Sequence, residues 1–194
     1  MDKFILYIPE SIQFSEEQLL TLLEGNRDLR IETDAKQNLI ILPPTDLQTG
    51  KINAALTYEF GKWNISANRG LVFGSSTGFT FPDGSIKAPD VSFVSHAQAE
   101  TITEKDKQGF AHIAPQFVLE LRSASDKKQD VIEKMELYME NDCKLGWLID
   151  PLELDYMIFR PKTPVETHDL TSETEIYGED ILPEFVLKWR EIDR

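Results

Sequence analysis

Cysteine and long hydrophobic runs are both scarce in this sequence. Cys143 is the single cysteine, so an internal disulfide cannot form, and the CxxC spacing of thiolate metal sites is missing. No stretch approaches the roughly 18 apolar residues that a membrane helix needs. The opening run Phe4–Leu6 is too short for a secretion signal, and no small-residue cleavage site follows it. These absences predict a protein of the reducing cytoplasm.

Basic residues are also few. The chain has 20 Lys and Arg against 34 Asp and Glu, a net charge of -14 and a pI near 4.6. Proteins that coat nucleic acid obtain most of their non-specific affinity by neutralising phosphates, so this balance argues against that class. It does not exclude a nuclease. In a metal-dependent active site the metal ion neutralises the carboxylates, and basic residues can form a local rim around that site.

Several motifs of metal and cofactor enzymes are missing. His96, His112 and His168 are scattered and lack the spacing of zinc sites. There is no complete P-loop and no GxGxxG sequence. We therefore expect neither a zinc site nor a nucleotide cofactor.

Length and hydrophobic patterning predict one α/β domain. The 194 residues, 41% of them hydrophobic, are enough for one core, so we expect a single domain over 1–194 with its core at about 15–190. Helical periodicity indicates helices at about 15–24, 46–66 and 127–141. Alternating or short apolar runs indicate strands at 29–32, 39–42, 71–73, 79–81, 86–87, 91–94, 117–121, 145–149 and 156–160, with edge strands and loops beyond. This order favours a mixed β-sheet flanked by helices.

Two carboxylates stand at the ends of predicted strands. Asp90 opens one strand, and Glu120 lies near the end of another. If the strands are neighbours, the side chains converge, and two unit charges ~4.5 Å apart repel by roughly 4 kcal/mol at an effective dielectric near 20. Such a pair shares a proton or binds a cation, and all-oxygen ligation suits Mg²⁺ or Mn²⁺. The alternative is that both are ordinary strand-end carboxylates, which are common.

Three further charged residues are candidates for the site. Lys134 borders the apolar stripe of its helix, where it could orient water or hold a phosphate; the alternative is a solvated lysine paired with Asp130. Glu59 falls within an apolar helix face, where a carboxylate is costly, so it is either a metal ligand or half of a salt bridge. Arg122 shares a strand face with Glu120 and would clamp phosphate or form an ion pair across the sheet.

These residues belong to a longer series of short motifs. In order, the motifs are Pro43–Thr45, Gly74–Phe79, Pro82–Gly84, Ala88–Val94, Pro115–Asp126, Lys134, Tyr138 and Trp147–Pro151. In their order and spacing, over roughly 15–190, the chain resembles the Uma-type family of bacterial restriction endonucleases, which is placed in the PD-(D/E)XK nuclease superfamily. The resemblance implies a restriction-endonuclease-like fold, DNA as substrate, and a Mg²⁺ or Mn²⁺ site with Asp90 and Glu120 as its two acids.

The resemblance leaves the catalytic cation open. The superfamily usually has lysine two residues after the second acid, where this chain has Arg122. The family is thought to take its lysine from the following helix, which here would be Lys134. On this hypothesis, Asp90 and Glu120 hold one or two divalent ions, and Lys134 positions water for in-line attack on a DNA phosphodiester.

Two other functions fit parts of the sequence. Gly74–Gly78 matches GxSxG, which would make Ser76 an esterase nucleophile, but that motif requires a following helix and Pro82 argues against one. The second is a catalytically inert nuclease-fold interaction module; it, like a nuclease, could be a homodimer. An active site would bring Asp90, Glu120 and a cation together around an open pocket, whereas a module would show the acids salt-bridged and occluded.

Overall fold

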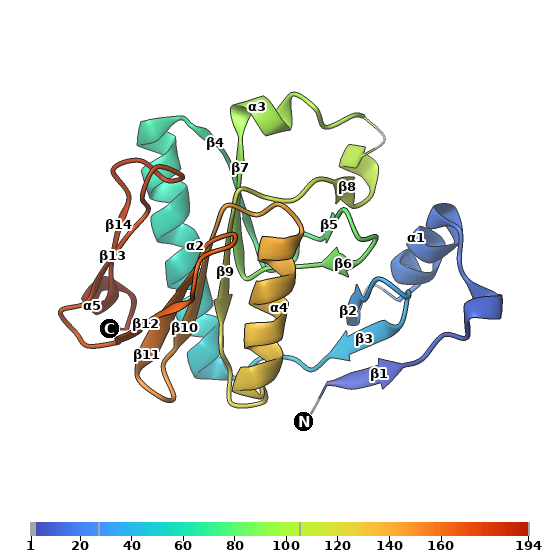
Figure 1. Ribbon diagram of the computed structural model, residues 1–194, viewed down its shortest axis with the longest axis horizontal. Helices are drawn as coiled ribbons and strands as arrows, with labels where there is room; N and C mark the ends of the chain where they lie inside the picture. The colour runs from blue at the N-terminus through green and yellow to red at the C-terminus, as the bar shows by residue number, and fades with distance from the viewer. Residues whose placement is uncertain (1–2, 27, 105, 194) are drawn as a thin grey trace.

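The structure, a computed structural model, describes residues 3–26, 28–104 and 106–193 (Figure 1). The helices are α1 (Glu16–Glu24), α2 (Leu47–Ala67), α3 (His96–Ala99), α4 (Lys128–Glu140) and α5 (Trp189–Ile192), with 3₁₀ turns η1 (Glu10–Ile12) and η2 (Asp106–Gln108). The strands are β1 (Phe4–Leu6), β2 (Arg30–Thr33), β3 (Leu39–Leu42), β4 (Gly70–Gly74), β5 (Phe79–Thr80), β6 (Ile86–Lys87), β7 (Val91–Ser95), β8 (Ala111–His112), β9 (Phe117–Leu121), β10 (Leu145–Asp150), β11 (Asp155–Phe159), β12 (Glu166–Asp169), β13 (Glu175–Tyr177) and β14 (Val186–Lys188). In the described part of the chain, no helix combines the length and apolar character that crossing a bilayer requires.

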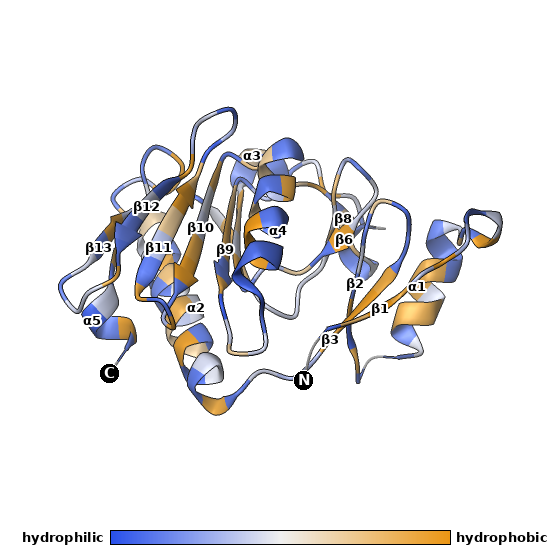
Figure 2. Ribbon diagram, turned by 60° about the horizontal axis from the view of Figure 1, so that its bottom comes forward, coloured by the Kyte–Doolittle hydropathy of each residue, from blue (hydrophilic) through white to orange (hydrophobic). Residues whose placement is uncertain are grey.

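A six-stranded sheet forms the centre of the fold, in the order β12-β11-β10-β9-β7-β4. β9 and β10 run parallel and the other neighbours run antiparallel, so the sheet is mixed, as the sequence predicted. Parallel neighbours need a crossover connection, and α4 supplies it between β9 and β10 (Figure 1). β9 and β10 are buried throughout, whereas β12 at the edge is exposed and hydrophilic (Figure 2).

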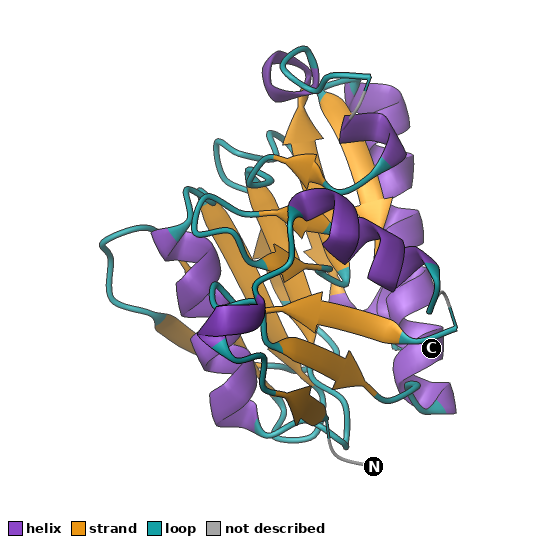
Figure 3. Ribbon diagram, turned by 90° about the vertical axis from the view of Figure 1, so that its right-hand side faces the viewer, coloured by secondary structure: helices purple, strands orange, loops and turns teal. Residues whose placement is uncertain are grey.

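Alternate residues of the central strands face two hydrophobic layers. On one face, Phe117 and Trp147 pack with Phe60 of α2. On the other face, Val118 packs with Met135 of α4. Since successive strand residues point to opposite faces, α2 and α4 cover opposite sides of the sheet, and Figure 3 shows helices on both sides of the strands.

The described residues also form three smaller sheets, in the orders β1-β3-β2, β6-β5-β8 and β13-β14. In Figure 1, β1, β2, β3 and α1 lie to one side of the central sheet. α1 begins with the capping box that the sequence predicts, formed by Ser15 and Gln18. β2 meets β6 where the Ile86 amide donates to Thr33 Oγ1 at 2.9 Å. This contact brings the side chains of β2 to the segment that leads into Asp90.

The predicted elements lie close to the observed ones, and the structure adds the short strands β1 and β8, which were not predicted. The helix predicted over 46–66 is α2, at Leu47–Ala67. The C-terminal tail holds edge strands, as expected, and adds the short helix α5. The Gly74–Gly78 segment turns back, with Thr77 N donating to Gly74 O, and enters β5. The esterase interpretation of Ser76 therefore lacks the helix that it requires.

Candidate active site

The register of β7 and β9 places Asp90 and Glu120 at neighbouring positions. Val91 pairs with Leu119, so the next antiparallel step sets Asp90, just before β7, opposite Glu120 on β9. Residues directly opposite in this arrangement have Cβ atoms about 4.5–5.5 Å apart. Asp90 is 8% exposed and Glu120 is 7% exposed. The condition set by the sequence, that these two strands be neighbours, is met.

Asp90 is held from two directions. Its Oδ1 accepts a hydrogen bond from Asn53 Nδ2 of α2 at 2.7 Å, and its Oδ2 accepts one from the Leu121 amide of β9 at 2.9 Å. These bonds fix the carboxylate between the long helix and the neighbouring strand. The orientation of Asp90 therefore depends on the docking of α2 against the sheet.

Glu120 is held from α4. Its Oε1 accepts a hydrogen bond from the Tyr138 hydroxyl at 2.8 Å and lies 2.8 Å from Lys134 Nζ. The pKa of Glu120 is raised to about 7, chiefly by burial; Lys134 opposes this rise, and the charges of Asp90 and Glu32 add to it. Both contacts use Oε1, so neither engages Oε2.

Lys134 lies between two carboxylates. Its Nζ is 2.8 Å from Glu120 Oε1 and 2.8 Å from Glu32 Oε1. Burial alone would lower the pKa of this lysine, but the two carboxylates outweigh burial and raise it above its usual range. Lys134 thus points toward the sheet. The alternative pairing with Asp130 is not found, because Asp130 contacts Lys3 at 2.8 Å.

Glu32 and Lys87 join this cluster although sequence reasoning gave neither a role. Glu32 is 3% exposed and Lys87 is 5% exposed, and Glu32 Oε2 lies 3.6 Å from Lys87 Nζ. Burial lowers the pKa of Lys87, while the two lysines hold the pKa of Glu32 below its usual value despite burial. Lys87 could have been suspected, since it lies three residues before Asp90. Glu32 carried no such signal, because nothing local shows that β2 packs against β6.

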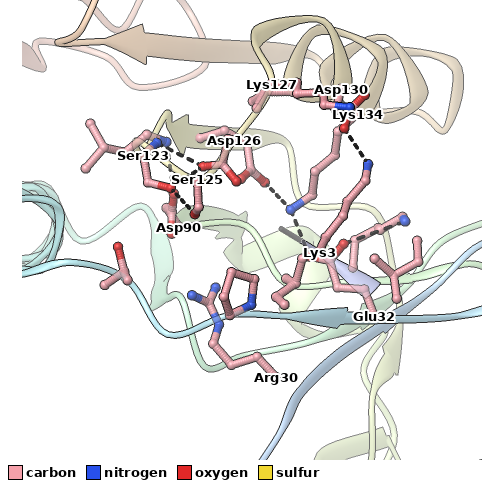
Figure 4. Close-up of a pocket in the computed structure, with 18 of the residues that line it drawn as sticks. Lys3, Arg30, Glu32, Asp90, Ser123, Ser125, Asp126, Lys127, Asp130 and Lys134 are labelled. Carbon is pink, nitrogen blue, oxygen red and sulfur yellow. Dashed lines mark hydrogen bonds and ion pairs between the residues drawn. The ribbon is translucent and has the colours of Figure 1, made fainter. Parts of the chain in front are cut away.

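The cluster opens into a cavity of about 470 Å³. Its walls come from β2 and β3, from α4, from the start of α2 and from the loop after β9. Figure 4 shows Lys134 reaching from α4 toward Glu32, with Arg30 on the opposite wall. Asp90 and Glu120 both line this space, so the acid pair faces an open pocket.

Two residues predicted for the site lie outside the cavity lining. Glu59 is half-buried on α2, where its Oε2 lies 2.8 Å from Lys62 Nζ one turn away. Arg122 Nη1 lies 2.6 Å from Asp150 and 2.7 Å from Glu153. Arg122 thus takes the ion-pair alternative, because the adjacent strand β10 ends in a buried carboxylate beside it. The structure brings together Asp90, Glu120 and Lys134, and it leaves Glu59 and Arg122 apart.

A second acidic group surrounds Arg122. Asp150, Glu153 and Asp155 have carboxylate oxygens within 4.8 Å of one another, which is close enough for a metal site. Lys128 Nζ lies 2.5 Å from Asp155 and 2.9 Å from Glu153, and Arg122 neutralises Asp150. Arg122 and Lys128 thus already neutralise these carboxylates, so the group forms an ion-pair network and offers no open position to a metal ion.

The donors around Asp90 suit a hard divalent cation. The carboxylates of Asp90 and Glu120 are oxygen ligands of the kind that Mg²⁺ and Mn²⁺ prefer. The amide oxygen of Asn53, whose Nδ2 donates to Asp90, is buried and accepts no hydrogen bond from the described residues. A buried acceptor without a donor costs free energy unless a water or an ion meets it. The residues present therefore fit a divalent metal.

Comparison with known proteins gives the fold and the family of the chain. The chain is similar to a crystal structure from Anabaena variabilis described as "a putative nuclease belonging to DUF820", with 18% sequence identity and a TM-score of 0.76. The similarity covers 93% of this chain and 98% of that one, which establishes a shared fold. No curated protein matches the sequence. Residues 16–190 match the Uma2 family, described as "Putative restriction endonuclease". With its mixed sheet, its acid pair and this match over most of its length, the chain belongs to the Uma2 family and has the fold of a nuclease.

Proposed function

We propose that the protein is a metal-dependent endonuclease that hydrolyses DNA phosphodiester bonds at a PD-(D/E)XK-type site. The observation that carries the proposal is the register of β7 and β9, which sets Asp90 opposite Glu120 beside Lys134 at an open cavity. Asp90 and Glu120 would hold Mg²⁺ or Mn²⁺, with Asn53 as an additional oxygen donor. The proposal includes a cytoplasmic location and a homodimer as the assembly.

The roles of the side chains follow from their protonation and contacts. A divalent ion bound here would lower the pKa of a bound water and stabilise the charge on the phosphate. Lys134 stays charged between its two carboxylates, so it can donate to a water or phosphate oxygen but cannot accept a proton. Burial and the Glu120 charge raise the pKa of Tyr138 well above its ordinary value, so its hydroxyl remains a donor that orients Glu120.

The inert interaction module is the second candidate, and one observation favours it. Glu120 is already salt-bridged to Lys134 and is only 7% exposed, as expected for an acid that has lost its catalytic role. The cavity of about 470 Å³ favours the nuclease, because an occluded acid pair would not line such a space. Metal binding separates the two candidates.

Mn²⁺ binding and DNA cleavage test the proposal. We expect calorimetry to detect Mn²⁺ binding by the wild type and Asp90→Asn to weaken it by about a hundredfold or more, because one ligand charge is lost. Asp169→Asn removes the same charge from exposed β12 and should bind as the wild type does. Glu120→Gln should abolish metal-dependent cleavage without unfolding the protein.

Two outcomes would count against the proposal, one against its site and one against the nuclease activity itself. Cleavage retained by Glu120→Gln would contradict the assignment of the second acid. Absence of Mn²⁺ binding in the wild type, together with absence of cleavage, would favour the interaction module.

A further inference from the structure

Glu32 occupies a position in this cluster that the proposed chemistry does not use. It belongs to β2, in the sheet β1-β3-β2, and not to the central sheet that carries Asp90 and Glu120. Its side chain is 4% exposed. A buried carboxylate is costly unless cations and donors compensate it. The contacts of Glu32 therefore indicate what it does.

Those contacts join two lysines and one backbone amide. Glu32 Oε1 lies 2.8 Å from Lys134 Nζ and accepts a hydrogen bond from the Ala88 amide at 3.2 Å. Glu32 Oε2 lies 3.6 Å from Lys87 Nζ. Ala88 lies two residues before Asp90, so Glu32 holds the lysine of α4 and the segment that leads into the first acid.

The charges explain why a second carboxylate is needed beside Lys134. The cluster contains three carboxylates, Glu32, Asp90 and Glu120, and two ammonium groups, Lys87 and Lys134. A divalent ion at Asp90 and Glu120 would compete with Lys134 for the charge of Glu120 and repel its ammonium group. Glu32 is the carboxylate that would still hold Lys134 in place.

We propose that Glu32 is a positioning residue, which fixes Lys134 beside the acid pair and keeps it there when Glu120 engages a cation. The proposal rests on the proposed function for the role of Lys134, but the positioning itself is a property of the fold. Glu32 acts through Lys134 and Ala88 and does not touch the substrate. The sheet β1-β3-β2 thereby becomes part of the catalytic apparatus, because it supplies this carboxylate.

Glu32→Gln tests the inference, because the amide keeps the size of the side chain and removes its charge. A lysine ammonium group ordered by carboxylates gives an NMR signal that a freely exchanging one does not. Wild-type protein should show such signals for Lys134 and for Lys128, which Glu153 and Asp155 hold elsewhere. In Glu32→Gln the Lys134 signal should be shifted without metal, where Glu120 still holds the ammonium group, and lost in Mg²⁺, while the Lys128 signal stays in both. Asp155→Asn is the matched control and should give the reverse.

Kinetics supply the second measurement. We expect Glu32→Gln to lower kcat by about a hundredfold, since misplacing a catalytic group by about 1 Å can have that effect. KM for DNA and the Mn²⁺ dissociation constant should change less than about threefold, because neither ligand touches Glu32. Glu32→Asp restores the charge and should recover part of kcat, whereas Asp155→Asn should leave kcat unchanged.

Each outcome is decisive. A Lys134 signal unchanged in Glu32→Gln overturns the inference, and so does a parallel loss of the Lys128 signal and Mn²⁺ binding, which would mean that Glu32 only maintains the fold. An unchanged kcat in an active enzyme also overturns it. If the wild type cleaves no DNA but the Lys134 signal responds as expected, the nuclease proposal fails while the positioning of Lys134 by Glu32 stands.

Discussion

Asp150 shows how one buried charge is compensated in this protein. Its carboxylate is fully buried at the end of β10, where Arg122 donates to Oδ2 at 2.6 Å and the Leu152 amide donates to Oδ1 at 3.0 Å. Burial alone would raise the pKa of Asp150, but these donors outweigh burial and hold the pKa below its ordinary value. The charged form is thus favoured in the folded state.

Asp150→Asn should therefore lower stability in a pH-dependent way. A carboxyl with a lowered pKa stabilises the fold above its unfolded pKa of about 3.9, and this stability is lost as the pH falls through the folded value. We expect the variant to be about 2 kcal/mol less stable than the wild type at pH 7, as for loss of a hydrogen bond to a charged group. The difference should shrink below about pH 4. Urea unfolding at pH 7 and pH 3.5 measures it.

The free energy of unfolding should be compared between variant and wild type at each pH. The other carboxylates titrate in both proteins, so their contribution cancels in the difference. Glu175→Gln on the exposed part of β13 should show no such dependence. A stability difference equally large at both pH values would mean that the shape of Asp150, and not its charge, stabilises this end of β10.

At the scale of elements, two glycines show how local packing limits substitution. Gly61 lies within α2, and an added Cβ would meet nothing within 4 Å. Gly70 opens β4, and an added Cβ would overlap the Val94 carbonyl oxygen of β7. The same substitution should therefore have opposite effects at these two positions.

Gly61→Ala should stabilise the protein. Glycine inside a helix loses more conformational freedom on folding than alanine, a difference of about 0.5–1 kcal/mol. Denaturant unfolding should show a gain of that size with an unchanged dependence on denaturant concentration. A loss of stability would show that the packing of α2 against its neighbours requires glycine here.

Gly70→Ala should destabilise the protein. The atom that it would strike belongs to the backbone of β7, so relief requires movement of a strand in the central sheet. Overpacking of this kind costs typically about 1–3 kcal/mol. The same unfolding experiment measures the loss, and equal stability of Gly70→Ala and wild type would contradict the tight approach of β4 to β7.

At the scale of the whole molecule, the net charge of -14 opposes contact with DNA, and a local rim must offset it. Lys3 at the cavity pairs with Asp130. Arg30 and Lys127 also line the cavity, and within the described residues neither has an ion-pair partner. On the proposed function, these two side chains are the free cations that remain for phosphate contacts.

DNA binding should accordingly depend only weakly on salt. Two phosphate contacts predict a slope of about -2 for the logarithm of the association constant against the logarithm of salt concentration. Fluorescence anisotropy with a labelled duplex in a metal chelator, over a range of salt concentrations, measures this slope. Arg30→Gln and Lys127→Gln should each make it shallower by about 1.

Lys144→Gln provides the matched control, because Lys144 is exposed and lies outside the cavity lining. It should leave the slope unchanged. A slope much steeper than about -2 in the wild type would mean that DNA contacts a wider basic surface than the rim of this cavity.

The local pattern of the sequence was enough to predict most helices and strands and to single out some of the candidate site residues. Periodicities of 3.6 and 2 reflect local geometry, so α2, α4 and the central strands could be predicted within a few residues. Asp90 and Glu120 became candidates because each stands at the end of an apolar strand. Lys134 became a candidate because it borders a helical stripe.

Only the tertiary structure decided which charges meet. Ion partners depend on distances between segments far apart in the chain, and periodicity carries no information about such distances. Glu32 and Lys134 are 102 residues apart in sequence, yet 2.8 Å separates their charged atoms. Arg122 follows Glu120 by two residues, yet it forms an ion pair with Asp150 at the end of β10 and does not line the cavity. The sequence by itself determined the strands and the two acids, and the packing of β2 and α4 around them decided which cation stands beside them.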